Sequence, residues 1–379
     1  MTYSKWNSYL GWLIFAIASA VYLMTIESTA SLWDCGEYIT AAYKLEVGHP
    51  PGAPLFMVLG RLFSFFAAPE NVAVYINALS AISSSLTILF MFWSLTLLIK
   101  KIVLKQGETL TGGNQFAIFS AASIGALAYT FSDSFWYSAV EGEVYALSSF
   151  FTALVFWAML KWEHQVDKDA RTDAGTGHSN ADRWIVFIFF MMGLSIGVHL
   201  LNLLTIPAIG FLYYFKHYKD ITIKNFIIAN AVVISVLMFI FKMLLPLTMA
   251  LFAKAEVFFV NSIGLPFNSG TIIVAIGIIL AFYFGLKYTY NKGHVLYNTL
   301  ILCVLFVLIG FSSWLMLPVR SNANVVINEN RPSDAREVLA YYNREQYGET
   351  ALFYGPQFSD SYAGLDEETP YKDEKPNYE

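Results

Sequence analysis

Charged side chains are scarce in this sequence. They make up 13% of its 379 residues, whereas 56% of the residues are hydrophobic. A soluble domain usually carries about a quarter charged residues, so this chain has too little polar surface to be covered by water. The scarcity of charge excludes a soluble globular protein and predicts an integral membrane protein.

Other common features are also missing. Only two cysteines, Cys35 and Cys303, are present, so no disulfide framework is indicated. No basic tract of the kind that binds nucleic acid occurs, and we expect no nucleic-acid partner. The sequence lacks a phosphate-binding P-loop, a dinucleotide fingerprint, a Gly-x-Ser-x-Gly elbow and a His-Glu-x-x-His zinc motif. Nucleotide-driven chemistry and covalent Ser/Cys catalysis are therefore unsupported.

Long apolar runs dominate what is present. Many of them approach the roughly 20 residues with which a helix crosses a bilayer, and the alternation typical of membrane strands is absent. We therefore predict an all-α polytopic membrane protein with about nine transmembrane helices. The predicted spans are residues 9–26, 75–99, 116–131, 144–162, 225–247, 271–290 and 295–318, and two short spans within 184–215 that meet near residues 199–202.

The segment after the first span has a different character. Residues 36–47 are predicted to form an amphipathic surface helix, which His49-Pro50-Pro51-Gly52 must end because consecutive prolines lack donors and disfavour helix before them. Residues 55–68 are apolar but too short for a span. They are interpreted as an interfacial or re-entrant helix of the first outer loop.

The positive-inside rule orients the chain. Lys5 and the cluster of lysines at 100–105 place the N-terminus in the cytoplasm and the first loop outside. Outside means the periplasm if the protein lies in a bacterial inner membrane, which is the expected location. Residues 163–183 then form a hydrophilic cytoplasmic linker, and residues 248–256 an outer segment with Lys254 and Glu256.

By the same parity the C-terminus is periplasmic. We predict a transmembrane domain over residues 1–318, a periplasmic polar segment over 319–365 and a disordered acidic tail over 366–379. Within the polar segment, a helix over 335–344 is expected to begin after Ser333 as its N-cap.

Ionisable side chains gather in the short outer loops. Ionisable groups at membrane depth are costly and indicate function, and an apolar surrounding raises a carboxyl pKa, which suits a general base. Asp34 and Glu37 would share one helix face because they are three residues apart. Capping of helices or plain solvation is the alternative for each of them. The outer-loop set comprises Asp34, Glu37, His49, Asp133, Glu141, Glu143 and His199.

Two further features allow more than one interpretation. His49 could bind a ligand or simply belong to a turn, and a divalent metal held by Asp34, Glu37 and His49 is possible in ligand type, although the spacing matches no strong metal motif. No cofactor is therefore assigned. Arg61 and Arg320 could grip a phosphate. The alternative for both is snorkelling or contact with lipid headgroups.

Several motifs together resemble a known family. They are Leu32-Trp33-Asp34-Cys35-Gly36-Glu37, Gly48-His49-Pro50-Pro51-Gly52-Ala53-Pro54, His199-Leu200-Leu201-Asn202, Arg320-Ser321-Asn322-Ala323-Asn324 and Ile327-Asn328-Glu329-Asn330. With the second loop around Glu141-Gly142-Glu143, they resemble the GT-C superfamily of membrane glycosyltransferases. They are more similar still to a bacterial multi-pass family related to the vertebrate O-mannosyltransferase of plexin-type receptors.

The resemblance implies a GT-C-like bundle and an inverting glycosyltransferase. Such an enzyme would move a sugar, mannose first, from a polyprenyl-phosphate carrier in the bilayer to a Ser or Thr hydroxyl of an exported protein. Asp34 matches the position of the catalytic base, with Glu37 beside it. Bacterial members of that family are longer, so a truncated form is also expected. The residues assigned to substrate binding are His49, Arg61, Glu141, Glu143, His199, Asn202 and Arg320.

Two other classes of function stay open at this point. A transporter or lipid-carrier flippase would use the same acids as ion or substrate sites, but the sequence has no internal repeat and no matching pair of broken helices. A non-catalytic membrane component of an envelope or secretion complex would use the outer tail as its contact.

Overall fold

The computed structural model describes residues 2–104, 109–171, 181–218 and 220–348. The chain divides into two compact units, Met1–Asn343 and Arg344–Glu379, and all the α-helices lie in the first. The described part of the second unit, residues 344–348, contains one 3-10 turn, Glu345–Tyr347. Across the described residues there is no β-strand, only an isolated parallel bridge between Val47 and Asn328. The predicted all-α class is confirmed, and the predicted tail at 366–379 lies outside the described residues.

Six helical segments of the described chain are long and apolar enough to cross a membrane, or seven if a bent pair counts as one span. The bent pair is α5 (Gly112–Thr130) and α6 (Asp133–Val140), which meet at 65°. The six segments contain α1 (Tyr3–Met24), α4 (Val72–Val103), α7 (Val144–Arg171), α10 (Ile223–Met238) with α11 (Leu245–Val257), α12 (Ser269–Asn291) and α13 (Val295–Phe311).

The predicted number of about nine differs for a simple reason. The two short spans expected within residues 184–215 are helices α8 (Asp182–Ile196) and α9 (Ile206–His217), separated by a break at the predicted place. With 15 and 12 residues they are shorter than the roughly 20 that a span needs. All nine apolar runs are helical, but only six or seven meet the length of a span.

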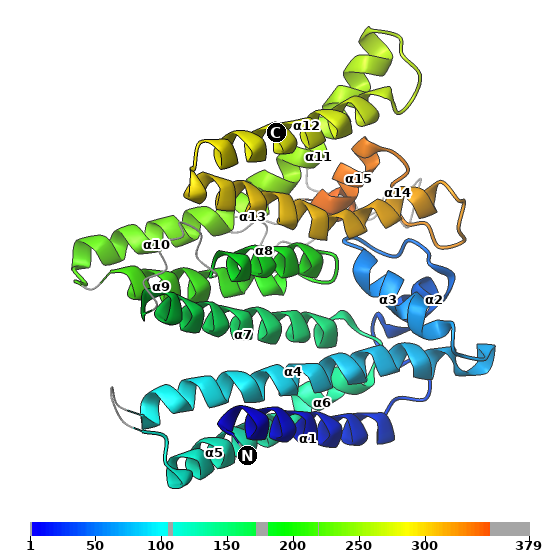
Figure 1. Cartoon of the computed structure of the whole chain (residues 1–379). Coiled ribbons are helices and arrows are strands. Elements are labelled where there is room, and N and C mark those ends of the chain that lie inside the picture. Colours follow the sequence, from blue (N-terminus) through cyan, green and yellow to red (C-terminus); the bar gives the residue numbers. More distant parts are fainter. Residues whose placement is uncertain (1, 105–108, 172–180, 219, 349–379) are drawn as a thin grey trace, which may run out of the picture. The chain divides into compact units, whose positions relative to one another are not determined.

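The long helices lie side by side in an order that departs from the chain order. Figure 1 shows the sequence α5 and α1, α4, α7, α8, α13 and α12, and the packed pairs are the same. Helices α8 and α13 approach most closely, because a Cβ on Gly193 would lie 2.3 Å from the Val307 carbonyl oxygen and one on Gly310 would lie 2.5 Å from the Leu194 nitrogen. Small residues at such a crossing allow backbone-to-backbone packing in membranes.

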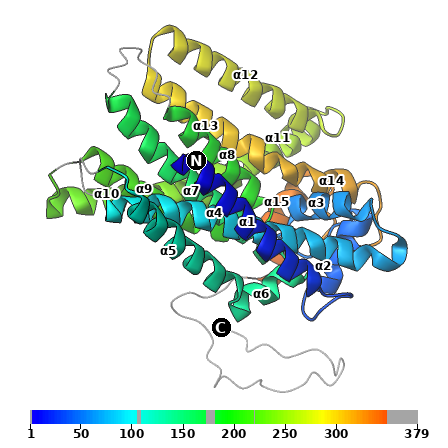
Figure 2. The same cartoon turned by 60° about the horizontal axis from the view of Figure 1, so that its bottom comes forward.

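The loop after α1 folds into two short helices at one end of the bundle. They are α2 (Cys35–Lys44) and α3 (Pro54–Ser64), which lie together beside one end of α4 in Figures 1 and 2. Both agree with the predicted surface helix and the predicted short apolar helix. With 11 residues, α3 is about 16 Å long, which is too short to cross a bilayer.

Three predicted boundaries are wrong. The span at 225–247 continues as a 40-residue helical stretch, Ile223–Ser262, so Lys254 and Glu256 lie on a helix and not in a loop. Two π-helical turns, Phe239–Leu244 and Phe258–Ser262, let the helix continue, and the first precedes the proline in the opening turn of α11. The Glu256 carboxylate accepts hydrogen bonds from the backbone N–H groups of Asn268 and Thr271, which ties α11 to the start of α12.

The hydrophilic linker also begins later than predicted. Helix α7 extends through Arg171, so its last turns occupy the first part of residues 163–183. Ion pairs support this extension, because Glu163 contacts Lys101 and Asp167 contacts Lys216. The middle of the predicted linker, residues 172–180, lies outside the described residues.

The third wrong boundary is the cap of α15 (Ala335–Asn343). The Asp334 side chain, not Ser333, accepts the free N–H groups of the first turn, at 2.8 Å from Arg336 and 3.1 Å from Glu337. A carboxylate is a strong acceptor at a helix N-terminus and also interacts favourably with the helix dipole.

Candidate active site

The N-terminus of α2 presents the first acidic residue of the site. Asp34 is the residue that precedes the helix, and its side chain is 58% exposed. Its carboxylate makes no capping hydrogen bond to the helix, so it is available to a reactant. The preceding Trp33 has φ of 62°, a left-handed conformation that is costly for a bulky residue, and its side chain is 94% exposed.

Glu37 lies one turn further along α2 and binds the histidine of the Pro/Gly turn. Its Oε2 is 2.9 Å from Nδ1 of His49, and its Oε1 accepts the backbone N–H of His49 at 2.6 Å. The Tyr38 ring contacts the imidazole edge-on, with centroids 5.7 Å apart. These contacts fix the orientation of the imidazole and direct Nε2 towards Asp34, whose Oδ2 is 3.9 Å away.

The two carboxylates shape the protonation of His49. Hydrogen bonding to Glu37 raises the pKa of His49, with the nearby charges of Glu37 and Asp34 adding to the effect. The same hydrogen bond to His49 lowers the pKa of Glu37. Each shift stabilises the charged form of its group, so the hydrogen bond between Glu37 and His49 favours a carboxylate paired with an imidazolium.

The turn that carries His49 leaves no room for larger side chains. A Cβ on Gly48 would lie 2.4 Å from Oε1 of Glu37, and Gly52 has φ of 73°, where a side chain would be strained. The peptide bond between Pro50 and Pro51 is cis. The turn is therefore a fixed support for the His49 ring.

The loop between α6 and α7 brings two more carboxyl groups to this region. Glu143 is only 7% exposed, and burial raises its pKa to about 7, with the negative charges of Asp34 and Glu141 as further causes. Glu141 accepts a hydrogen bond of 2.8 Å from the Ser31 hydroxyl, which joins the second loop to the first. Asp133, also predicted in this loop, is exposed at the start of α6.

A third segment, far along the chain, completes the cluster. Val47 donates its N–H to the Ile327 carbonyl and accepts from the N–H of Glu329, both at 3.0 Å. Burial raises the pKa of Glu329, and the charge of Glu37 raises it further, so this carboxyl belongs to the same electrostatic group. Glu329 stands in a motif that carries the family resemblance. The sequence alone does not assign its carboxyl group to the site, because nothing in the sequence pairs it with residue 47.

The two arginines lie at the other end of α2. Arg61 donates to the Tyr43 carbonyl, and Arg320 donates to the carbonyls of Leu45 at 2.6 Å and Lys44 at 3.1 Å. These carbonyls end the helix and carry its partial negative charge. Because α2 has ten residues, this end is about 15 Å from Asp34. The structure thus does not bring the two arginines together with the acidic cluster.

His199 and Asn202 occupy the break between α8 and α9. The His199 ring lies 5.5 Å from the ring of Tyr145, two residues after Glu143, and burial lowers its pKa. Leu55 donates its N–H to the Gly197 carbonyl at 2.8 Å, so this break adjoins the first loop. Asn202 is fully buried and donates to the Ser195 hydroxyl at 2.9 Å, which places it inside the bundle and away from solvent.

The arrangement supports proton transfer and charge stabilisation. Asp34 is an exposed acceptor, His49 is a base beside it whose pKa is raised, and Glu143 is a buried carboxyl whose pKa is raised to about 7. One ligand atom from each of Asp34, Glu37 and His49 lies within 4.8 Å of the others, so the donor set would also suit a divalent cation. Since Nδ1 of His49 is bound to Glu37, Nε2 is the nitrogen left for such an ion.

Residues 34–222 match the family model described as the protein O-mannosyl-transferase TMEM260 N-terminal domain. The match begins at Asp34 and includes α2, α3, the loop that carries Glu141 and Glu143, and the break between α8 and α9. It covers just under half of the chain, which is thus similar to an O-mannosyltransferase family.

Two curated relatives point the same way. The chain is 29% identical over 148 residues to the protein O-mannosyl-transferase tmem260 of Dictyostelium discoideum, which is 38% of this chain and 16% of the relative. It is 27% identical over 150 residues to the protein O-mannosyl-transferase TMEM260 of Mus musculus, which is 40% of this chain and 19% of the relative. The alignments thus span less than a fifth of either relative. No solved structure matches the chain.

Proposed function

We propose that this chain is the catalytic membrane part of an inverting protein O-mannosyltransferase. It would take mannose from a polyprenyl-phosphate carrier and transfer it to Ser or Thr hydroxyls of exported proteins. The observation that carries the proposal is the exposed Asp34 carboxylate beside the His49–Glu37 pair on the first outer loop. The two relatives are named protein O-mannosyl-transferases, and this name suggests the reaction class.

In the proposed reaction Asp34 accepts the proton of the attacking hydroxyl. The hydroxyl oxygen then forms a bond to the anomeric carbon of mannose while the bond from that carbon to the carrier's phosphate oxygen breaks. The phosphate leaves with its carrier and gains negative charge. One displacement inverts the anomeric centre, so a β-linked donor gives an α-linked product.

The leaving phosphate needs a positive partner in this mechanism. Both arginines are engaged with backbone carbonyls at the far end of α2, so their side chains support the helix and do not face the reacting groups. His49 is the cation at the acidic cluster, and its Nε2–H is free to donate to a phosphate oxygen. Fixed donors aimed at developing charge are a large source of catalysis.

The proposed location is a bacterial inner membrane with the site on the periplasmic side. Helix α1 carries Lys5 at its start, and the chain reaches Asp34 soon after α1 ends. Helix α4 carries Lys100 and Lys101 in its last turn, far from the loops that hold the site. This polarity, with cations at one end and carboxyl groups at the other, supports a cytoplasmic N-terminus.

The test is a comparison of wild type with Asp34→Asn in detergent, using polyprenyl-phosphate-mannose and a Ser/Thr acceptor peptide. Loss of a general base is expected to lower the rate roughly a hundred- to ten-thousand-fold. Release of mannose to water is measured in parallel, because that reaction needs no acceptor. Asp133→Asn is the matched control, since it removes an exposed carboxylate of the next loop. Equal turnover by wild type and Asp34→Asn would contradict the assignment of the base.

A further inference from the structure

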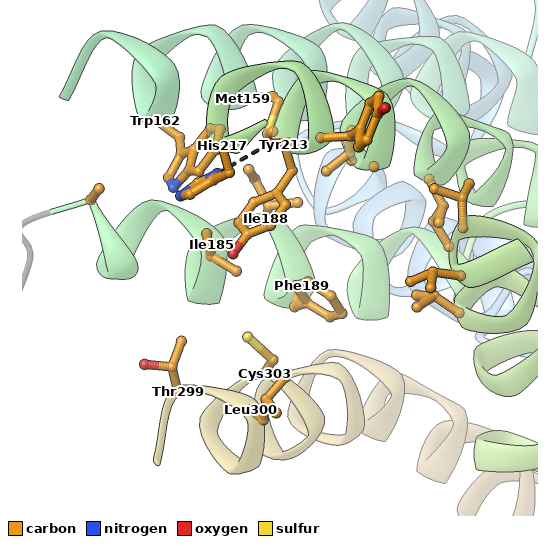
Figure 3. Close-up of a pocket in the computed structure, with 18 of the residues that line it drawn as sticks. Met159, Trp162, Ile185, Ile188, Phe189, Tyr213, His217, Thr299, Leu300 and Cys303 are labelled. Atoms are coloured by element: carbon orange, nitrogen blue, oxygen red, sulfur yellow. Dashed lines mark hydrogen bonds between the residues drawn. The ribbon is translucent and has the colours of Figure 1, made fainter. Parts of the chain in front are cut away.

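A large apolar cavity lies apart from the candidate site. It has a volume of about 840 Å³ and is bounded by α7, α8, α9, α10 and α13. Figure 3 shows Trp162, Tyr213 and His217 on one side and Thr299, Leu300 and Cys303 of α13 on the other. None of the residues assigned to the candidate site lines it.

The directions of the helices place the cavity towards the opposite end of the bundle. Helix α7 starts beside Glu143 and reaches the cavity at Met159 and Trp162. Helix α8 starts at the cavity with Asp182 and ends at Ile196, shortly before His199. The polar lining residues Asp182, Asn225 and Thr299 mark the end of the cavity away from the acidic cluster, whereas Met192 and Ile206 carry the cavity towards the break between α8 and α9.

One side of the cavity is open along the faces of two apolar helices. Lining residues of α10 and α13 are exposed, among them Val232 at 55%, Leu296 at 65% and Leu300 at 52%. The inner wall contains buried side chains such as Ile188 and Met192. Because α10 and α13 belong to segments that qualify as membrane spans, the opening faces hydrocarbon, and an acyl chain suits it better than water.

An aromatic stack marks the polar end of the cavity. The rings of Tyr213 and His217 are stacked at 4.2 Å, and Trp162 stacks on both at 5.6 Å and 6.0 Å. Tryptophan and tyrosine are enriched at the membrane interface, where hydrocarbon meets the lipid headgroups. Trp162 is buried and forms part of the cavity wall, whereas Tyr213 is 44% exposed and is the ring of this stack that suits the headgroup level of one leaflet.

Exposed cations lie at the same end. Arg183 and Lys224 adjoin the lining residues Asp182 and Asn225 in sequence, and Lys292 ends α12 just before α13. Lys216 is different, because it contacts Asp167. The nearby acids are Asp167, which pairs with Lys216, Asp182, which lines the cavity and accepts a hydrogen bond from Thr299 at 3.4 Å, and Asp220. Exposed positive charge beside a hydrocarbon-lined cavity matches an anionic phospholipid.

We propose that this cavity binds one anionic phospholipid. An acyl chain would enter between α10 and α13, and the phosphate would lie near Arg183 and Lys224. The site does not depend on the proposed transferase activity, because the lipid would be a bound component and not a reactant.

The experiment places the whole chain in nanodiscs that contain equal parts of phosphatidylglycerol and phosphatidylethanolamine. Lipid that stays bound after transfer to detergent is identified by native mass spectrometry. Wild type is expected to retain one lipid, enriched several-fold in phosphatidylglycerol. Arg183→Gln with Lys224→Gln should lose that enrichment, whereas Lys5→Gln with Lys254→Gln, two exposed cations elsewhere, should keep it.

A second pair of variants tests the acyl chain. Cys303→Phe and Thr299→Phe each place a ring in the cavity, so retention of lipid should fall at least several-fold in whichever of them folds. Folding is judged from the melting temperature. Retention of no lipid by wild type, or of only phosphatidylethanolamine or polyprenyl phosphate, would overturn the proposal. So would unchanged enrichment in the Arg183→Gln/Lys224→Gln protein.

Discussion

Glu143 shows how burial, with the charges of Asp34 and Glu141 adding to it, changes the chemistry of a carboxyl group. Its pKa near 7 means that the group is about half protonated at neutral pH. Such a carboxyl can donate a hydrogen bond to a sugar hydroxyl in one state and accept one in the other. At acidic pH the Glu143 carboxyl is neutral. Its negative charge is then absent from the cluster that contains His49, Glu37 and Asp34.

The raised pKa predicts how stability depends on pH. The folded protein holds the Glu143 proton more tightly than the unfolded chain, whose carboxyl titrates near 4.5. Stability from this group is therefore present below about pH 4.5 and is lost as the pH rises towards 7. Glu143→Gln should raise the melting temperature relative to wild type at pH 8, and the difference should shrink on going to pH 5.

The measurement is a thermal melt of both proteins in detergent across this pH range. Asp133→Asn serves as the control, because it removes an exposed carboxyl that does not contribute to the pKa shift of Glu143. A difference between Glu143→Gln and wild type that stays constant from pH 5 to pH 8 would rule out titration of Glu143 as its cause.

At this scale the sequence predicts part of the site. Asp34, Glu37 and His49 are close in the chain, so a helix and a turn suffice to bring them together. Glu329 contributes through a bridge to Val47, which no local pattern indicates. The guanidinium of Arg61 predicts a phosphate-binding role, but the sequence does not show that this group contacts the backbone of α2.

Among the elements, α2 decides the geometry of the site. Its first residues carry Asp34 and Glu37, and its last carbonyls are bound by Arg61 and Arg320. The helix ends at Leu45 in a left-handed conformation, with φ of 52°. The two guanidinium groups therefore hold one end of a helix whose other end presents the proposed base.

Arg320→Gln should loosen α2. Loss of the hydrogen bonds to Lys44 and Leu45 is expected to cost roughly 1.5–3 kcal/mol, the range for hydrogen bonds to charged groups. The transfer rate should fall as well, although the residue does not touch the acidic cluster. Both quantities are measured on the same preparation, by denaturation and by the mannose-transfer assay.

Arg336→Gln is the control for this change. Its side chain is 59% exposed and pairs with Asp334 at 3.3 Å, so its loss should cost no more than about 1 kcal/mol. If Arg320→Gln behaves like Arg336→Gln in both measurements, then Arg320 does not support α2.

Helices as elements were predictable, and their ends were less so. Hydropathy indicates all the long helices because each needs an apolar face or an apolar length. The ends of helices depend on contacts with other parts of the chain. Glu163 on α7 pairs with Lys101, and Glu256 on α11 accepts a hydrogen bond from Asn268, which precedes α12. These contacts extend both helices beyond their apolar residues.

At the scale of the whole molecule, the C-terminal part of the unit Met1–Asn343 returns to the first loop. The Tyr341 hydroxyl donates to the Gly48 carbonyl at 2.5 Å, and the ring is fully buried against Trp314. Residues 319–365 were predicted as a separate polar segment. The described portion up to Asn343 packs within the first unit, because its aromatic side chains join the apolar core.

Tyr341→Phe should destabilise the protein by roughly 1–3 kcal/mol. The change keeps the ring but leaves the buried Gly48 carbonyl without this donor, which costs its desolvation. The transfer rate should fall, since Gly48 precedes His49. Tyr342→Phe is the matched control, because that hydroxyl makes only a long contact of 3.5 Å to the Phe241 carbonyl. Equal effects of the two substitutions on stability and rate would exclude a specific role for Tyr341.

The contact between Tyr341 and Gly48 also sets an order of events during synthesis. The two residues are 293 positions apart, and chains grow at about 5–20 residues per second. The turn that holds His49 therefore waits roughly 15–60 s for its partner while the later helices enter the membrane. Until then the turn lacks this hydrogen bond, so its support is complete only once the chain has been made as far as Tyr341.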